Sequence, residues 1–298
     1  MSSFLLFLPM VAQLGGGIGS QSASQLPLEI IEKKDDEART RQQQAYSQPA
    51  APVSRNGCMD QVQSDPQGSA DLARGALQNA IGREKVRAGL CLGAALTLLE
   101  RFDEASDAFV TARDAAEADD HVSRARLGDM AANAELARGD GAKALLLLGA
   151  ALTEARASED KGLIADVDID RARALVAVQQ PEEAGAALAE ARTVQPDNAQ
   201  AWLLSATLSR RQKQYIQASA QIEQAAKLAP TDPAIGLEAG VIAMLSNDEN
   251  AARRSWQSVL AVAPQSPEAQ TAQGYLDQIG PEAPPSAPAQ DPQTPPHD

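Results

Sequence analysis

The sequence is poor in the side chains that most catalytic and metal sites require. It has two histidines, His121 and His297, and two cysteines, Cys58 and Cys91, in 298 residues. A histidine-based metal site or acid–base pair needs more histidine than this. Serine and aspartate are plentiful but stand in no recognisable nucleophile–base motif. We therefore expect a protein that is not an enzyme and that carries no cofactor and no metal ion.

Aromatic residues and positive charge are also scarce. Aromatics make up 3% of the chain, and the formal net charge is −14. Nucleic-acid binding needs clustered Lys and Arg against the phosphates, and single strands need aromatic stacking platforms. Anionic membrane surfaces require the same positive charge. The composition thus argues against nucleic acid as a partner and favours a solvated acidic surface.

Strand-like patterns are missing as well, because there are no long β-branched runs with alternating polarity. The central region is instead dominated by Ala and Leu, which enter helices at little cost. We predict an all-α fold.

Three prolines stand at equal intervals of 34 residues, at Pro196, Pro230 and Pro264, and each closes a helix-like segment. Proline lacks a backbone N–H and disfavours helix in the residue before it, so it ends the segment. The pairs Asp232-Pro233 and Ser266-Pro267 then place a capping side chain before a proline suited to the first helical position. Asp65-Pro66 repeats this signal upstream. The prolines therefore mark the joints of a repeat.

When the repeats are aligned on these prolines, small and large residues coincide. Ala206 aligns with Gly240, and Ile222 aligns with Trp256. Two antiparallel helices cross closely only where a small side chain lets their backbones approach. Each unit is therefore expected to hold two helices, which break near Lys213-Gln214 and near Asn247-Asp248 in the two clearest units.

The 34-residue unit resembles the tetratricopeptide repeat, whose pattern runs W-x2-L-G-x2-Y, then A-x3-F, then A and P. The matching residues of the best unit are Trp202, Ala206, Tyr215, Ala218, Ile222, Ala225 and Pro230. The resemblance implies a right-handed α-solenoid of about five to six helix–turn–helix units. The helix that carries Ala272, Tyr275, Leu276 and Ile279 would cap its C-terminal end.

The earlier units keep the pattern with wider spacing. Their anchor alanines Ala105, Ala144 and Ala184 lie 39 and 40 residues apart. This spacing implies longer helices or loops around residues 114–124 and 154–164.

Four regions follow from these patterns. Residues 1–23 are a candidate signal peptide, because the apolar run from Phe4 to Leu14 suits a secretory signal, although no basic residue precedes it. Residues 24–54 are predicted to be a linker, partly helical or disordered, and 55–280 the solenoid. Residues 281–298 hold seven prolines and are expected to be a disordered tail. We expect a periplasmic or secreted protein; a buried or disordered N-terminal tail and a cytoplasmic protein are the alternatives.

Export would place Cys58 and Cys91 in an oxidising compartment, where a cysteine pair is often bridged. Their spacing fits no zinc or redox motif. A disulfide and two buried thiols are the alternatives.

One segment, "DVDIDRARALVA" at 166–177, begins like a calcium-binding loop. It has Arg171 where such a loop needs glycine, and Ala177 where it needs a bidentate glutamate. We interpret Asp166 and Asp170 as acids near a helix N-terminus, where the helix dipole favours them. His121, at a repeat boundary, is expected to be solvated.

In a tetratricopeptide solenoid the first helices line a concave face. This resemblance predicts a groove that binds an extended segment of a protein partner, with arginines for its carboxylates. The alternative is that these arginines only keep the helix faces soluble. The predicted groove residues are Ile169, Arg173, Leu203, Thr207, Arg210, Arg211, Leu237, Val241 and Met244. The expected function is that of an interaction scaffold or adaptor in a bacterial-type cell envelope; a cytoplasmic regulator or an accessory subunit of an enzyme complex is the alternative.

Overall fold

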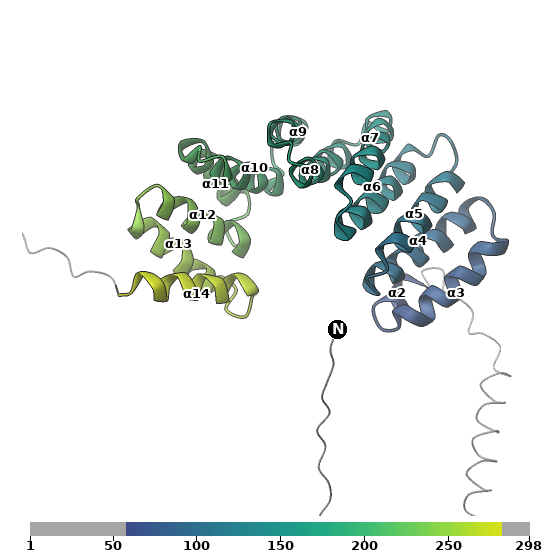
Figure 1. Cartoon of the computed structure of the whole chain (residues 1–298), viewed down its shortest axis with the longest axis horizontal. Coiled ribbons are helices and arrows are strands. Elements are labelled where there is room, and N and C mark those ends of the chain that lie inside the picture. Colours follow the sequence, from purple (N-terminus) through teal and green to yellow (C-terminus); the bar gives the residue numbers. More distant parts are fainter. Residues whose placement is uncertain (1–57, 282–298) are drawn as a thin grey trace, which may run out of the picture. The chain divides into compact units, whose positions relative to one another are not determined.

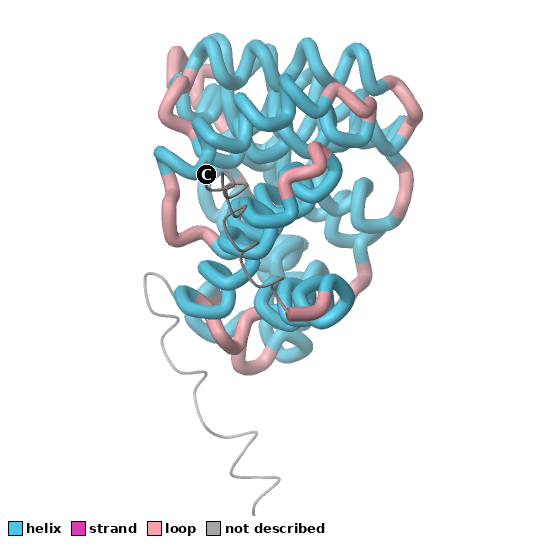
Figure 2. The backbone as a smooth tube through the Cα atoms, turned by 90° about the vertical axis from the view of Figure 1, so that its left-hand side faces the viewer, coloured by secondary structure: helices cyan, strands magenta, loops and turns pink. Residues whose placement is uncertain are grey.

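A computed structural model of the chain describes residues 58–281, which belong to one compact unit. This part holds thirteen helices and no strand, so the all-α prediction is confirmed (Figures 1 and 2). The helices are α2 (Met59–Val62), α3 (Pro66–Asn79), α4 (Gly82–Leu98), α5 (Phe102–Ala115), α6 (His121–Arg138), α7 (Gly141–Ser158), α8 (Lys161–Ala177), α9 (Pro181–Val194), α10 (Ala199–Arg211), α11 (Tyr215–Leu228), α12 (Pro233–Leu245), α13 (Glu249–Val262) and α14 (Pro267–Ile279). The predicted signal peptide, the linker and the tail from residue 282 onward lie outside the described residues.

The helices form five consecutive antiparallel pairs, from α4–α5 to α12–α13, with α3 before them and α14 after them. Each helix packs against its predecessor and its successor. The first helices also touch one another, since α6 contacts α8, α8 contacts α10, α10 contacts α12 and α12 contacts α14. The second helices of the described pairs make no comparable contacts with one another. The first helices α4, α6, α8, α10 and α12, with α14, therefore share one side of the stack, which we call the inner face (Figure 1).

The predicted caps and stops are confirmed. Asp65, Asp232 and Ser266 each accept a hydrogen bond from a backbone N–H in the first turn of α3, α12 and α14, at 2.9, 2.8 and 3.0 Å. The helices α9, α11 and α13 each end two residues before one of the three regularly spaced prolines. Local side-chain chemistry thus sets where these helices begin and end.

The turn inside each unit has one backbone geometry. Its central residue adopts a positive φ between 57° and 88°, at Glu100, Gly139, Gln179, Lys213 and Asn247. The N–H of the next residue donates to the carbonyl five residues earlier at 2.8–2.9 Å, which is the Schellman closure of a helix C-terminus. The predicted breaks near Lys213 and Asn247 are confirmed.

Close crossings between the helices of a pair depend on small residues. A Cβ added to Gly93 would lie 2.5 Å from the Phe109 ring, and one added to Gly240 would lie closer still to Trp256. Where the facing residue is aliphatic, the small residue is alanine, as at Ala206 opposite Ile222 in the same core cluster. The crossing therefore matches glycine with an aromatic ring and alanine with a branched aliphatic chain.

The wider spacing of the earlier units comes mainly from longer helices. Helices α6 and α7 have 18 residues each, whereas α10 and α11 have 13 and 14. Only Glu159 and Asp160 separate α7 from α8. Between the two alternatives left open by the sequence, the structure thus favours longer helices around 154–164, and a short loop at 116–120 adds to them before α6.

The last helix covers the C-terminal end of the stack, as predicted. Ala272 is buried, and the ring of Tyr275 lies 5.0 Å from that of Trp256. Arg253 of α13 donates from Nη1 to the carbonyl of Gly280 at 2.7 Å and so holds the end of α14. The apolar stripe of α14 therefore closes the core cluster of the last unit.

Candidate binding surface on the inner face

All nine predicted groove residues lie on first helices, but four of them are used for packing. Ile169 is 4% exposed and Leu203 is 7% exposed, each within a core cluster. Leu237 and Val241 are half-buried against the cluster that includes α14. The prediction that Ile169 and Leu203 line the groove is corrected, because both side chains are buried in core clusters of the stack.

Two of the three predicted arginines are already paired with acids of the same chain. Arg210 Nε lies 2.6 Å from Glu238 Oε1, and this ion pair joins α10 to α12. Arg173 pairs directly with Asp170, one helical turn earlier. Arg211 is exposed and has no ion pair within the described part of the chain. Arg211 therefore remains as the arginine that is free to meet a carboxylate of a partner.

The first helix next to that of Arg211 carries exposed apolar side chains. Met244 is 38% exposed and Leu245 is 42% exposed, both at the C-terminal end of α12. Thr207 is partly exposed on α10. We call Thr207, Arg211, Met244 and Leu245 the inner patch. Sequence reasoning missed Leu245, although the 34-residue register makes it the equivalent of Arg211 in the preceding unit.

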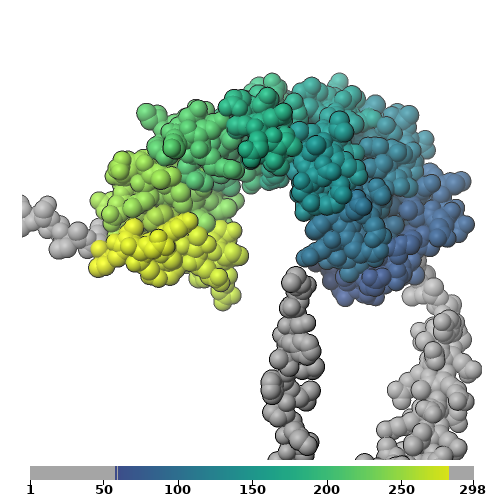
Figure 3. All heavy atoms as spheres, in the orientation of Figure 1, coloured from purple at the N-terminus to yellow at the C-terminus, as the bar shows by residue number. Residues whose placement is uncertain are grey.

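Seen from the side, the described stack is hollowed along the first helices (Figure 3). The inner patch lies on two adjacent first helices of this side, α10 and α12, which the Arg210–Glu238 pair holds together. An extended chain laid there would meet apolar contact area and one cation.

A second polar group on the inner face joins α6 to α8. Asn133 Nδ2 donates to Asp170 Oδ2 at 2.6 Å and lies 3.4 Å from Asp129 Oδ2. Burial, together with the negative charges of Asp170 and Asp166, raises the pKa of Asp129 to about 8. Burial and the charge of Asp170 likewise raise the pKa of Asp166. Sequence reasoning missed Asp129 and Asn133, because their partner stands 37 residues away.

The interpretation of Asp166 and Asp170 as acids near a helix N-terminus is corrected. Helix α8 begins at Lys161, with the Asp160 side chain accepting from the N–H of Leu163 at 3.1 Å. Both acids lie beyond the first turn, where the helix dipole has faded. Asp170 instead accepts the hydrogen bond from Asn133 that joins α6 to α8.

His121 is also not simply solvated. Its Nδ1 lies 2.7 Å from Glu154 Oε2, and Arg124 Nε donates to the other oxygen of Glu154 at 2.7 Å. These hydrogen bonds, that of His121 first, lower the pKa of Glu154. These three side chains connect the start of α6 to the last part of α7, the two helices that are longer than those of the later units.

Within residues 58–281 no group of three side chains is placed to hold a metal ion. No helix in this range is both long enough and apolar enough to cross a membrane.

Comparisons with known proteins support the same architecture. No protein-family model matches the chain, and a search of curated proteins found no match. Among solved structures it is similar to PilW, a type IV pilus biogenesis factor, with a TM-score of 0.58, 17% identity, and coverage of 72% of this chain and 94% of PilW. It is also similar to BtubC of P. vanneervenii, with a TM-score of 0.56, 14% identity, and coverage of 80% and 99%. For PilF of Pseudomonas aeruginosa the TM-score is 0.50 and the identity 14%, with coverage of 72% and 99%. The chain has the tetratricopeptide repeat fold. At these identities the likeness concerns the fold alone.

The residues of the tetratricopeptide pattern have visible structural roles. Trp202, at the first position of the pattern, donates from Nε1 to the carbonyl of Pro196 at 2.8 Å. The guanidinium of Arg192, from the preceding unit, lies 4.7 Å from the centre of its ring. Trp202 therefore packs at the junction between two tetratricopeptide units and contacts residues of the preceding unit.

Proposed function

We propose that this tetratricopeptide protein is a non-enzymatic scaffold that binds an extended segment of a partner protein along its inner face. The observation that carries the proposal is the inner patch, where two exposed apolar side chains accompany a free arginine. Exposed methionine and leucine beside a guanidinium suit a peptide with an apolar side chain and a carboxylate. In this proposal Arg210 joins α10 to α12 through Glu238, Arg173 stays paired with Asp170 on its own helix, and Arg211 meets the partner.

The proposed location is the periplasm or the cell exterior. The apolar run from Phe4 to Leu14 supports export, and so does the pairing of Cys58 with Cys91 described below. The alternative is a cytoplasmic regulator or an accessory subunit of an enzyme complex. Fractionation of the native cell with N-terminal sequencing separates the two, since an intact Met1 in the cytoplasm would reject export.

The proposed function is tested by capturing partners from the native cell with the full chain and comparing two matched variants. Arg211→Glu should lower capture of the identified partner about tenfold or more, because it reverses the charge of the inner patch. Arg254→Glu makes the same charge change on an exposed residue of the second helix α13 and should leave capture unchanged. Arg210 is kept intact, since its loss would leave Glu238 unpaired.

The apolar part of the inner patch has its own test. Met244→Ser with Leu245→Ser should weaken the same interaction, whereas Val262→Ser, at an exposed position of α13, should not. Equal capture by all of these variants would reject the inner patch as the binding surface.

A further inference from the structure

The N-terminal end of the stack is built differently from every other described unit. The helix that precedes α3 is α2, with 4 residues, whereas the first helices of the five full pairs have 13 to 18. Among the described helices, α2 packs mainly against α3 and α4. A single turn thus occupies the place of a complete first helix.

Packing alone holds α2 weakly. Of its residues whose burial is described, Val62 alone is buried, and Asp60 and Gln61 are exposed. A helix of one turn has no stability of its own, because nucleation is unfavourable and ordering each residue reduces chain entropy. The burial of one valine side chain offsets only a small part of the chain entropy that is lost when residues 58–64 become ordered.

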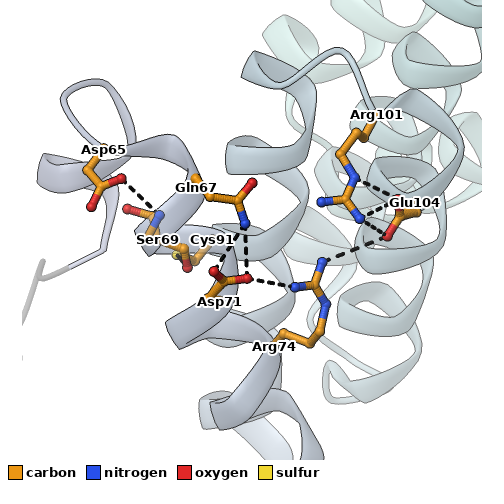
Figure 4. A network of polar contacts seen from close by, with 9 residues as sticks. Asp65, Gln67, Ser69, Asp71, Arg74, Cys91, Arg101 and Glu104 are labelled. Carbon is orange, nitrogen blue, oxygen red and sulfur yellow. Dashed lines mark hydrogen bonds and ion pairs between the residues drawn. The ribbon is translucent and has the colours of Figure 1, made fainter.

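A covalent bond is placed where packing is weakest. Cys58 stands directly before α2 and is joined to Cys91 of α4, with 6.0 Å between the two Cα atoms, a normal separation for a disulfide. Cys91 is buried, and its Sγ lies 4.0 Å from the carbonyl oxygen of Ser69 on α3 (Figure 4). The bond therefore fastens the start of α2 to α4, at a point where α4 lies against α3.

Helix α3 has independent attachments. Asp65 caps it, Ala70 and Ala73 are buried in its core cluster, and Arg74 Nη2 lies 3.8 Å from Glu104 of α5 (Figure 4). None of these contacts depends on the sulfur atoms. Loss of the disulfide should therefore release α2 and leave α3 in place.

We propose that the Cys58–Cys91 disulfide is a redox-sensitive latch that holds α2 over the N-terminal end of the stack. A dithiol reductant opens it by thiol–disulfide exchange: the S–S bond takes up two electrons and two protons to give two thiols, and the dithiol becomes a disulfide. Reduction frees residues 58–64 and uncovers the apolar residues around Val62. The latch does not depend on the inner patch.

The test measures hydrogen exchange by mass spectrometry on the full chain, with and without dithiothreitol. A free-thiol count on the untreated protein comes first and should find none. On reduction, exchange of residues 58–64 should reach the rate of an unstructured peptide, while α4 to α13 keep their protection. Cys58→Ser should show the reduced behaviour from the start and should not respond to dithiothreitol.

Three results would overturn the latch. The first is a count of two free thiols in the untreated protein. The second is unchanged exchange at 58–64 after the count has risen to two, which would mean that packing holds α2. The third is loss of protection throughout the stack, in which case the bond stabilises the whole fold and releases no single segment. Arg211→Glu should leave the exchange pattern unchanged, so the latch and the proposed binding surface fail separately.

Discussion

The two units in α6–α9 and the two units in α10–α13 share the same helix–turn–helix repeat, but they differ in helix length and in the residues that they bury. The later pair keeps the 34-residue register with helices of 13 and 14 residues. Three of the four helices in the earlier pair have 17 or 18 residues. All buried acids of the described chain, Glu135, Asp168 and Asp170, lie in the earlier pair. Among the described residues the compact units therefore bury no acid, whereas the long units bury three.

The buried acids of the long units differ in whether their carboxylate oxygens have hydrogen-bond or ion-pair partners. Glu135 lies 2.7 Å from Lys143 Nζ and 2.8 Å from Arg138 Nη2. Asp168 has no hydrogen-bond partner on either oxygen, and its nearest cation, Arg171, is 3.6 Å away. Burial raises the pKa of Asp168. Because a buried unpaired charge is costly, the long units should be the part of the stack whose stability depends on pH.

The largest effect is expected from a change of shape in the compact units. Gly240→Ala places a Cβ against the Trp256 ring, and should lower the free energy of unfolding by about 3 kcal/mol, since both partners are buried and neither can move aside. Denaturant unfolding measures the loss. Adding Trp256→Leu recreates the alanine–aliphatic pairing of Ala206 with Ile222, so the two changes together should cost less than their sum.

The matched control lies in a long unit. Gly149 is in the middle of α7, and a Cβ added there meets no atom within 4 Å. Gly149→Ala should therefore raise the free energy of unfolding by about 0.5–1 kcal/mol through helix propensity. A loss of stability in this control similar to that of Gly240→Ala would contradict the role given to the Gly240–Trp256 contact.

The next effect concerns charge in the long units. Asp129→Asn should raise the free energy of unfolding at pH 8 and change it little at pH 4. The pKa of Asp129 is about 8 in the folded protein, as burial and the charges of Asp170 and Asp166 outweigh that of Arg173. Between about pH 4 and pH 8 the unfolded chain releases this proton while the folded chain keeps it, so stability falls as the pH rises. Urea unfolding at both pH values measures the difference.

Asp119→Asn, at an exposed position before α6, removes the same formal charge without touching this group and is the control. Equal gains from Asp119→Asn and Asp129→Asn would show that net charge, and not the contact between α6 and α8, governs the pH dependence.

The features predictable from the sequence are those set by neighbours along the chain. Pro230 and Asp232 act on their own helix ends, and Gly240 and Trp256 recur in register with Ala206 and Ile222. Such signals need no knowledge of the tertiary structure. This is why the units, their breaks and the closing helix were predictable, although the chain matches no family model.

The sequence predicted which helices form the inner face, but it did not predict which of their side chains are free. Whether a side chain there is free depends on the next unit, 28 residues on for Arg210 and Glu238, and 37 for Asn133 and Asp170. Ile169 and Leu203 likewise belong to core clusters that include residues of the next unit. One sequence shows the register of these residues but not which of them meet.

The smallest effect is expected at the turns, where long and compact units share one geometry. Lys213 has φ 62°, a left-handed conformation that is unfavourable for a residue with a Cβ, whereas Gly139 occupies the equivalent turn of the α6–α7 unit. Lys213→Gly should raise the free energy of unfolding by about 0.5 kcal/mol, because relief of the strain exceeds the added entropy of the unfolded chain. Asn247→Gly is the matched control, since asparagine tolerates this conformation, and it should change stability less. Thermal unfolding of both variants measures the difference, and a loss on Lys213→Gly would mean that the lysine side chain, and not the backbone, stabilises the turn.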